Sequence, residues 1–222
     1  MLQSVIVVGE MLRDVYQIPR RRVHVILNGV DKNVFQNNLS LGLEFRSKLD
    51  VPVNGSLVLR VAGRLVKDKG HPLLYEAFSK LITKHPHVYL IVAGTRVGEP
   101  IQGIRPQGLD LTLMEAMISG KAVVASRFPS IKGSIVVDYE FGFMFSPNVE
   151  SLLEALEEVV GEGPKRLARR GKASQEYAAS TFTASKIALA YERLFLCIKS
   201  DTFCVYPWDM LDFDTFITFS LS

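Results

Sequence analysis

Short apolar runs alternate along this chain with longer segments in which apolar residues recur every three or four positions. The apolar runs predict buried strands at residues 4–8, 23–27, 56–62, 87–93, 122–125 and 142–145. The helical periodicity predicts helices at residues 11–16, 73–82, 111–118, 149–160, 164–180 and 184–198. Strands that alternate with helices are typical of an α/β domain, whose mostly parallel sheet is covered on both faces.

The composition restricts the class of protein. A chain of 222 residues is long enough for one large domain, or for one domain and a fragment. With 48% hydrophobic and 22% charged residues, wholesale disorder, collagen-like repeats and a disulfide scaffold are excluded. The net charge of +3 demands neither nucleic acid nor an anionic membrane. Basic clusters at residues 20–22 and 165–172 lack interleaved aromatic residues, so we interpret them as solvated faces and expect no nucleic-acid partner.

Cysteine and histidine do not predict a metal site or a disulfide framework. Cys197 and Cys204 are interpreted as reduced thiols, and the four histidines show no metal-ligand spacing with them. We therefore expect no metal and no cofactor. No apolar run reaches the roughly 20 residues of a membrane span. Residues 1–9 resemble a strand more than a signal peptide, which makes a cytosolic location the default expectation.

The C-terminal residues differ in kind from the rest of the chain. Residues 199–222 are predicted to form an acidic aromatic tail after a domain spanning residues 1–198. Four of the 23 acidic residues and none of the 26 basic residues fall in residues 200–222, so that segment carries −4 and residues 1–199 carry +7. Such a tail either folds back on the basic body, recruits a partner, or is a weakly ordered extension.

Two loops lie where an open α/β sheet binds its ligands, beyond the carboxyl ends of the strands. The first is residues 63–70, in which Arg64 and Lys69 offer two cations suited to a pyrophosphate, although a solvated basic loop has the same composition. The second, residues 105–110, enters a helix whose free N–H groups favour a phosphate. Glu115 follows within that helix, where it is either a ribose ligand or an ordinary surface glutamate.

Four segments taken together resemble a known family. They are V-H-V-I-L-N-G-V-D-K-N-V-F at residues 23–35, G-R-L-V-K-D-K-G at residues 63–70, Q-G-L-D-L-T-L-M-E-A-M at residues 107–117, and F-G-F-M-F-S-P at residues 141–147. In this order they resemble the C-terminal, donor-binding half of the family-four (group one) retaining glycosyltransferases of the GT-B fold, in a plant-like branch. The resemblance covers residues 1–198 and implies an incomplete Rossmann-like parallel sheet with flanking helices.

The resemblance assigns roles to the loop residues. Arg64 and Lys69 would hold the donor diphosphate, and the backbone of Gly108, Leu109, Asp110 and Leu111 would contact phosphate or sugar. Glu115 matches the second Glu of the family's E-x7-E motif and would bind the nucleotide ribose. The first Glu is replaced by Gln107, a sugar-facing candidate whose amide forms hydrogen bonds but supplies no negative charge to an oxocarbenium-like transition state.

The sequence departs from the family between residues 95 and 106. The family has further sheet and helix there, whereas a βαβ unit needs about 30 residues and only 12 are present. The missing unit normally helps to form the nucleobase pocket. Loss of a central strand leaves two edges built to be buried, so the sheet is expected to re-pair, open or aggregate.

Two functions follow as expectations. The first is transfer of a hexose from a nucleotide sugar, with a UDP-sugar as the favoured donor, with retention of configuration and without a metal. The alternative is a non-catalytic fragment that binds a nucleotide sugar or a protein partner, including self-association through sheet edges. The acceptor is not encoded in any motif that we recognise.

Overall fold

The computed structural model describes residues 14–19, 24, 26, 28–63, 65, 69–94, 111–127 and 139–200. The predicted strand at residues 4–8 and the C-terminal tail lie outside this part of the chain. The described helices and strands follow one another in the order α2 (Leu39–Lys48), β1 (Leu57–Ala62), α3 (His71–Lys84), β2 (Val88–Ala93), α4 (Leu111–Ile118), β3 (Val123–Ser126), β4 (Gly142–Phe145), α5 (Val149–Thr181) and α6 (Ala184–Ser200).

The four described strands form two parallel pairs. β1 pairs with β2 from Leu57↔Val88 to Ala62↔Ala93, and β3 pairs with β4 from Val123↔Gly142 to Ser126↔Phe145. Within the described residues no ladder joins the two pairs. The predicted parallel α/β arrangement is therefore confirmed. The predicted loss of a unit between residues 95 and 106 falls outside the described residues.

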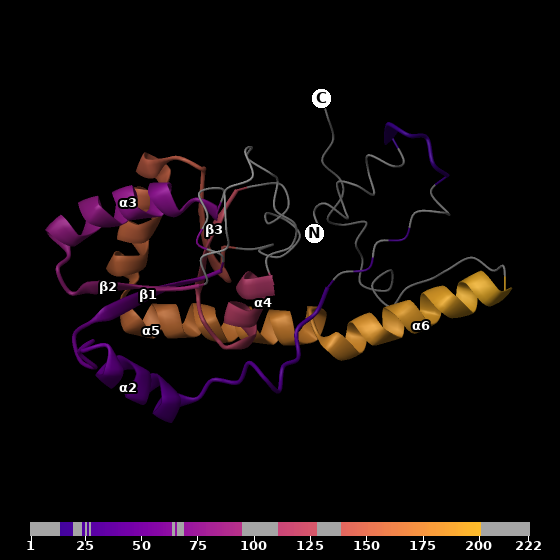
Figure 1. Cartoon of the computed structure of the whole chain (residues 1–222), viewed down its shortest axis with the longest axis horizontal. Coiled ribbons are helices and arrows are strands. Elements are labelled where there is room, and N and C mark those ends of the chain that lie inside the picture. The colour runs from indigo at the N-terminus through magenta and orange to yellow at the C-terminus, as the bar shows by residue number, and fades with distance from the viewer. Residues whose placement is uncertain are drawn as a thin grey trace.

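Helix α5 changes direction part-way along its length (Figure 1). Gly163 has φ 75° and ψ 166°, which no right-handed helix accommodates, and Pro164 follows it. The proline begins a new helical segment because its fixed φ suits a first turn and its missing N–H costs nothing there. The two helices predicted at residues 149–160 and 164–180 are thus both present, and they meet at this kink.

The first half of α5 packs against α3 and the first strand pair. Leu152 and Leu156 on α5 lie in one buried cluster with Ala77 and Leu81 on α3, and with Val88 at the start of β2. Leucine and alanine recur there at helical spacing, which is the periodicity that the sequence displayed. This cluster extends to Val124 and Phe145, so it also connects the two strand pairs.

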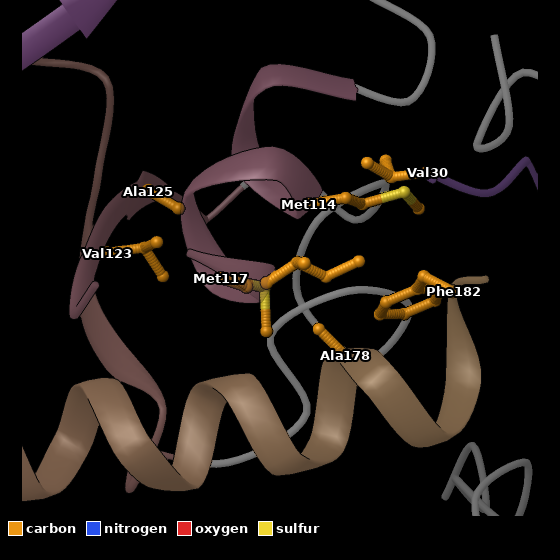
Figure 2. Close-up of a cluster of buried hydrophobic side chains, with 8 residues drawn as sticks. Val30, Met114, Met117, Val123, Ala125, Ala178 and Phe182 are labelled. Carbon is orange, nitrogen blue, oxygen red and sulfur yellow. The ribbon is translucent and has the colours of Figure 1, made fainter. Parts of the chain in front are cut away.

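The second half of α5 packs against α4 and the second strand pair, around a cluster shown in Figure 2. Met114 and Met117 are fully buried and fill the centre of this cluster. The backbone of α5 at Gly171 closely approaches that of Gly120, just after α4. At the end of α4, the side chain of Gln175 also donates from Nε2 to Ile118 O at 2.8 Å. The cluster consists of Val30, Met114, Met117, Ile118, Val123, Ala125, Ala178 and Phe182.

The segment before α2 crosses to the junction between α5 and α6. Val30 N donates to Phe182 O at 2.9 Å, and Ala184 N donates to Val30 O at 3.2 Å. The strand predicted at residues 23–27 is not seen at its two described residues, because His24 and Ile26 are in irregular backbone. Ile26 instead packs on Ala190 of α6. Ile26 is therefore used for packing on a helix.

Helix α2 was not predicted, and the reason lies in its sequence. Leu39, Leu41, Leu43 and Phe45 alternate with Ser, Gly and Glu, which is the period of a strand. In a helix this alternation scatters the apolar side chains, and all four are exposed. Local hydrogen bonds favour the helix: Asn38 Oδ1 accepts from Leu41 N at 3.0 Å as an N-cap.

Replacing Gly171 tests the close packing of α5 on α4. A Cβ atom there would lie 2.2 Å from Gly120 O, so we expect Gly171→Ala to destabilise the fold by about 1–3 kcal/mol. Gly161→Ala is the matched control, because a Cβ at Gly161 on the same helix meets nothing within 4 Å. The control should gain up to about 1 kcal/mol from helix propensity. Urea unfolding followed by circular dichroism measures both, and equal midpoints would contradict the packing.

Tyr177 should make the fold sensitive to alkali. Its ring stacks on Phe141 at 4.6 Å and meets Phe182 edge-on at 5.5 Å, and burial raises its pKa from 10.0 to about 12. The unfolded chain therefore loses this proton first, and stability falls as pH rises from 10 to 12, by about 2 kcal/mol. Tyr177→Phe should lose less stability over this interval, as measured by urea unfolding at pH 9 and 12. Equal losses would show that another group is responsible.

Candidate functional site

The carboxyl ends of β1 and β2 meet at two glycines. Gly63 N donates to Ala93 O at 3.0 Å, and Gly63 has φ 146°, which favours glycine. A Cβ atom on Gly94 would lie 1.8 Å from Gly63 O, so the two chains leave the strands in backbone contact. This contact fixes the place from which the loop containing Arg64 departs.

Lys69 lies beside this edge, immediately before α3. Gly70 adopts the left-handed conformation at φ 76° and caps α3 without a side-chain hydrogen bond. Because α3 follows β1 after a short connection, its amino end lies near the carboxyl end of that strand. Lys69 is half-buried, and together with the positive end of the helix dipole it makes this edge suited to an anion. Arg64 lies outside the described residues.

His71 occupies the first position of α3 and is 7% exposed, with its ring 5.8 Å from that of Tyr75. Its burial against Tyr75 shows that it takes part in the packing at the start of α3.

Glu115 lies on α4, beside the second strand pair. The predicted helix at residues 111–118 is confirmed with the same bounds. Leu111 is exposed at its start, and Glu115 is half-buried in the second turn, adjacent to the buried Met114. Gln107, Gly108, Leu109 and Asp110 lie outside the described residues. The structure thus places Lys69 at one strand pair and Glu115 at the other.

Two cations that the sequence analysis did not single out, Arg60 in β1 and Lys121 just before β3, lie close enough to influence each other electrostatically. The pKa of Lys121 is lowered by desolvation and by the positive charge of Arg60 in β1. Lys121 Nζ also donates to Asn37 Oδ1 at 3.2 Å. Arg60 is the charged residue of an otherwise apolar strand, and that interruption is the signal that could have identified it.

A surface pocket lies at a different place, at the amino end of β4, lined by Tyr139, Glu140, Arg169 and Arg170. Arg170 is engaged there in structural contacts. Its Nε donates to both carboxylate oxygens of Glu162 at 2.8 Å, its Nη1 donates to Tyr139 O, and its guanidinium lies 4.6 Å from the ring centre of Phe143. Hydrogen bonding to Arg170 lowers the pKa of Glu162. We therefore interpret this pocket as part of the support of α5.

Within the described residues no cluster of three or more His, Cys, Asp or Glu residues is arranged to hold a metal ion. Cys197 is a free thiol and is buried on α6. Across the same residues, no helix combines the length and apolar character that crossing a membrane requires.

Solved structures with this arrangement of strands and helices are glycosyltransferases. A glycosyltransferase from Rickettsia africae matches with a TM-score of 0.71 and 19% identity, over 88% of this chain and 62% of its own. Anabaena HepE in complex with UDP matches with a TM-score of 0.62 and 18% identity, over 83% and 59%. The C-terminal domain of the group 1 glycosyltransferase LpcC from Francisella tularensis matches with a TM-score of 0.57 and 19% identity, over 70% of this chain and 100% of that domain.

The chain has the fold of the GT-B glycosyltransferases. It spans about three fifths of the solved chains from Rickettsia africae and Anabaena, and all of the C-terminal domain of LpcC. No protein-family model and no curated protein sequence matches the chain. The likeness is therefore one of fold.

The Glu162–Arg170 pair should contribute stability that disappears in acid. Because Arg170 holds the pKa of Glu162 below its ordinary 4.5, this contribution is present above pH 4.5 and is lost as pH falls through the lowered value. We expect Glu162→Gln to cost about 1.5–3 kcal/mol at pH 7 and to lose less stability than the parent on further acidification. Urea midpoints at pH 7 and pH 3 measure this. Glu154→Gln, at an exposed position of the same helix, is the control, and parallel acid losses in parent and E162Q would refute the assignment.

Proposed function

We propose that this chain is the donor-binding domain of a hexosyltransferase and binds a UDP-sugar. The observation that carries the proposal is the entry into α3, where Lys69 and the uncapped, left-handed Gly70 lie beside the Gly63–Gly94 contact. A cation and the positive end of a helix dipole at that edge suit a diphosphate. Anabaena HepE, which shares this fold, has been solved with UDP and with UDP-glucose.

The residues take separate roles in this proposal. Arg64 and Lys69 hold the diphosphate, and the backbone from Gly108 to Leu111 contacts phosphate or sugar. Glu115 accepts hydrogen bonds from the ribose hydroxyls, for which its place on α4 next to the buried Met114 provides a rigid base. Gln107 faces the transferred hexose. The donor domain comprises residues 1–198, and residues 199–222 form an additional tail.

The proposed reaction is transfer of a hexose with retention, as in the family-four glycosyltransferases of the plant-like branch. Departure of the nucleoside diphosphate builds negative charge, and the two cations of the residue 63–70 loop stabilise this charge without a metal ion. Gln107 contributes hydrogen bonds to the hexose and no charge, so the diphosphate contacts carry most of the stabilisation.

A second candidate is a binding protein without turnover, which engages a nucleotide sugar or a protein partner. The observation that favours it is the separation of β1–β2 from β3–β4 within the described residues. Lys69 lies beside the β1–β2 pair and Glu115 beside the β3–β4 pair. A ligand that contacts both residues is therefore held by two strand pairs that no described ladder joins. Transfer demands closer control of geometry than binding does.

Binding of UDP is tested by thermal unfolding with and without the nucleotide. At about 100 times its Kd, UDP should add roughly 2.7 kcal/mol to the stability of the native chain. Lys69→Ala should weaken UDP binding about tenfold by removing a charged contact to the diphosphate. Lys84→Ala is the matched control, because Lys84 lies at the other end of α3 and pairs with Glu157. Equal UDP responses in both variants would refute the assignment of Lys69.

Glu115→Gln distinguishes the proposed ribose contact from the proposed diphosphate contact. It should weaken binding of UDP, which carries a ribose, and leave binding of inorganic pyrophosphate unchanged, whereas Lys69→Ala should weaken both. Calorimetric titration measures these affinities. Release of free hexose from UDP-glucose, or its transfer to an added acceptor, would establish the transferase, and binding without turnover would establish the second candidate.

A further inference from the structure

Helix α6 presents two apolar rows, and within the described residues only one of them is covered. The inner row, Ile187, Ala190, Leu194 and Cys197, recurs at spacings of three and four, and its first three members pack with Ile26. The outer row is Tyr191, Phe195 and Ile198, which are 45%, 64% and 68% exposed. Leu189 and Leu196 are exposed as well.

The outer row is built as a packing surface. Its members are four and three residues apart, so they share one face over two turns of helix. The rings of Tyr191 and Phe195 already stack at 6.3 Å, which preorganises a flat apolar patch. Figure 1 shows α6 extending away from the rest of the described structure, where no described element lies over it. A helix that is apolar on both sides is normally buried on both.

Residues 201–222 have the composition and the position to cover this row. They start where α6 ends and contain six aromatic residues, four aspartates and no basic residue. α6 itself carries Lys186, Arg193 and Lys199 against Glu192, so the two segments are complementary in charge. An extended chain of 22 residues reaches on the order of 70 Å. The 17 residues of α6 rise only about 25 Å, so the tail is long enough to run back along the whole helix.

We propose that residues 201–222 turn back after α6 and dock on the Tyr191–Phe195–Ile198 row. Their aromatic side chains pack on that row, and their aspartates lie among the basic residues of α6. The docked tail shields the most exposed apolar surface of the helix. This interaction is independent of the nucleotide-sugar site.

Trp208 is the single tryptophan of the chain and lies within the proposed docking segment, so its fluorescence reports docking directly. In the native full chain its emission should be blue-shifted and protected from acrylamide, relative to the urea-unfolded chain. Phe195→Ala with Ile198→Ala should shift the emission back to the red and remove the protection. Leu41→Ala is the matched control, because Leu41 is 62% exposed on α2, and it should leave the signal unchanged. Circular dichroism checks that the variants, altered only at exposed positions, remain folded.

Three outcomes would overturn the proposal. Emission and quenching of Trp208 that are the same in the native parent as in the unfolded chain exclude docking. Protection that survives the double substitution on α6 places the tail elsewhere. Protection that increases with protein concentration shows that the tail docks on a second copy. Protection that is independent of concentration, lost with the α6 row and weakened by high salt supports the proposal.

Discussion

The packing of one kinked helix on both strand pairs is the constraint on which the rest of this structure depends. Within the described residues no hydrogen-bonded ladder joins β1 to β3, so α5 is the element that links the two pairs. Its first half supplies Leu152 and Leu156 to the cluster around α3 and β2. Its second half supplies Ala178 to the cluster around α4 and β3. The left-handed Gly163 between the halves allows one helix to serve two cores.

This constraint also determines how the proposed donor site is held. Lys69 is positioned by β1, β2 and α3, and Glu115 is positioned by α4, so the distance between them depends on α5 more than on a continuous sheet. The Arg170 guanidinium stabilises α5 next to its kink by joining Glu162 to Tyr139 and Phe143. Changes around Arg170 are therefore expected to reach the site through the geometry of α5, although Arg170 itself lies at the amino end of β4.

Two helices, α2 and α6, carry apolar side chains that remain exposed outside the buried clusters. α2 exposes four apolar side chains because its alternation has the period of a strand, and only local capping and turn contacts favour its helix. α6 exposes a regular helical row instead, and regularity is what distinguishes a packing surface from scattered exposure. The difference explains why we propose an occupant for the row on α6 and none for α2.

The sequence by itself determined the identity and order of most elements, since periodicity is a local property. It predicted α4 and β4 with the observed bounds, the two helical segments on either side of the Gly163 kink, and the parallel α/β class. Tertiary structure decided the rest. Whether Ile26 lies in a strand or on α6 depends on partners far away in the chain. How the two described strand pairs are held together depends on α5, because burial of apolar surface against a distant helix is not encoded in any local pattern.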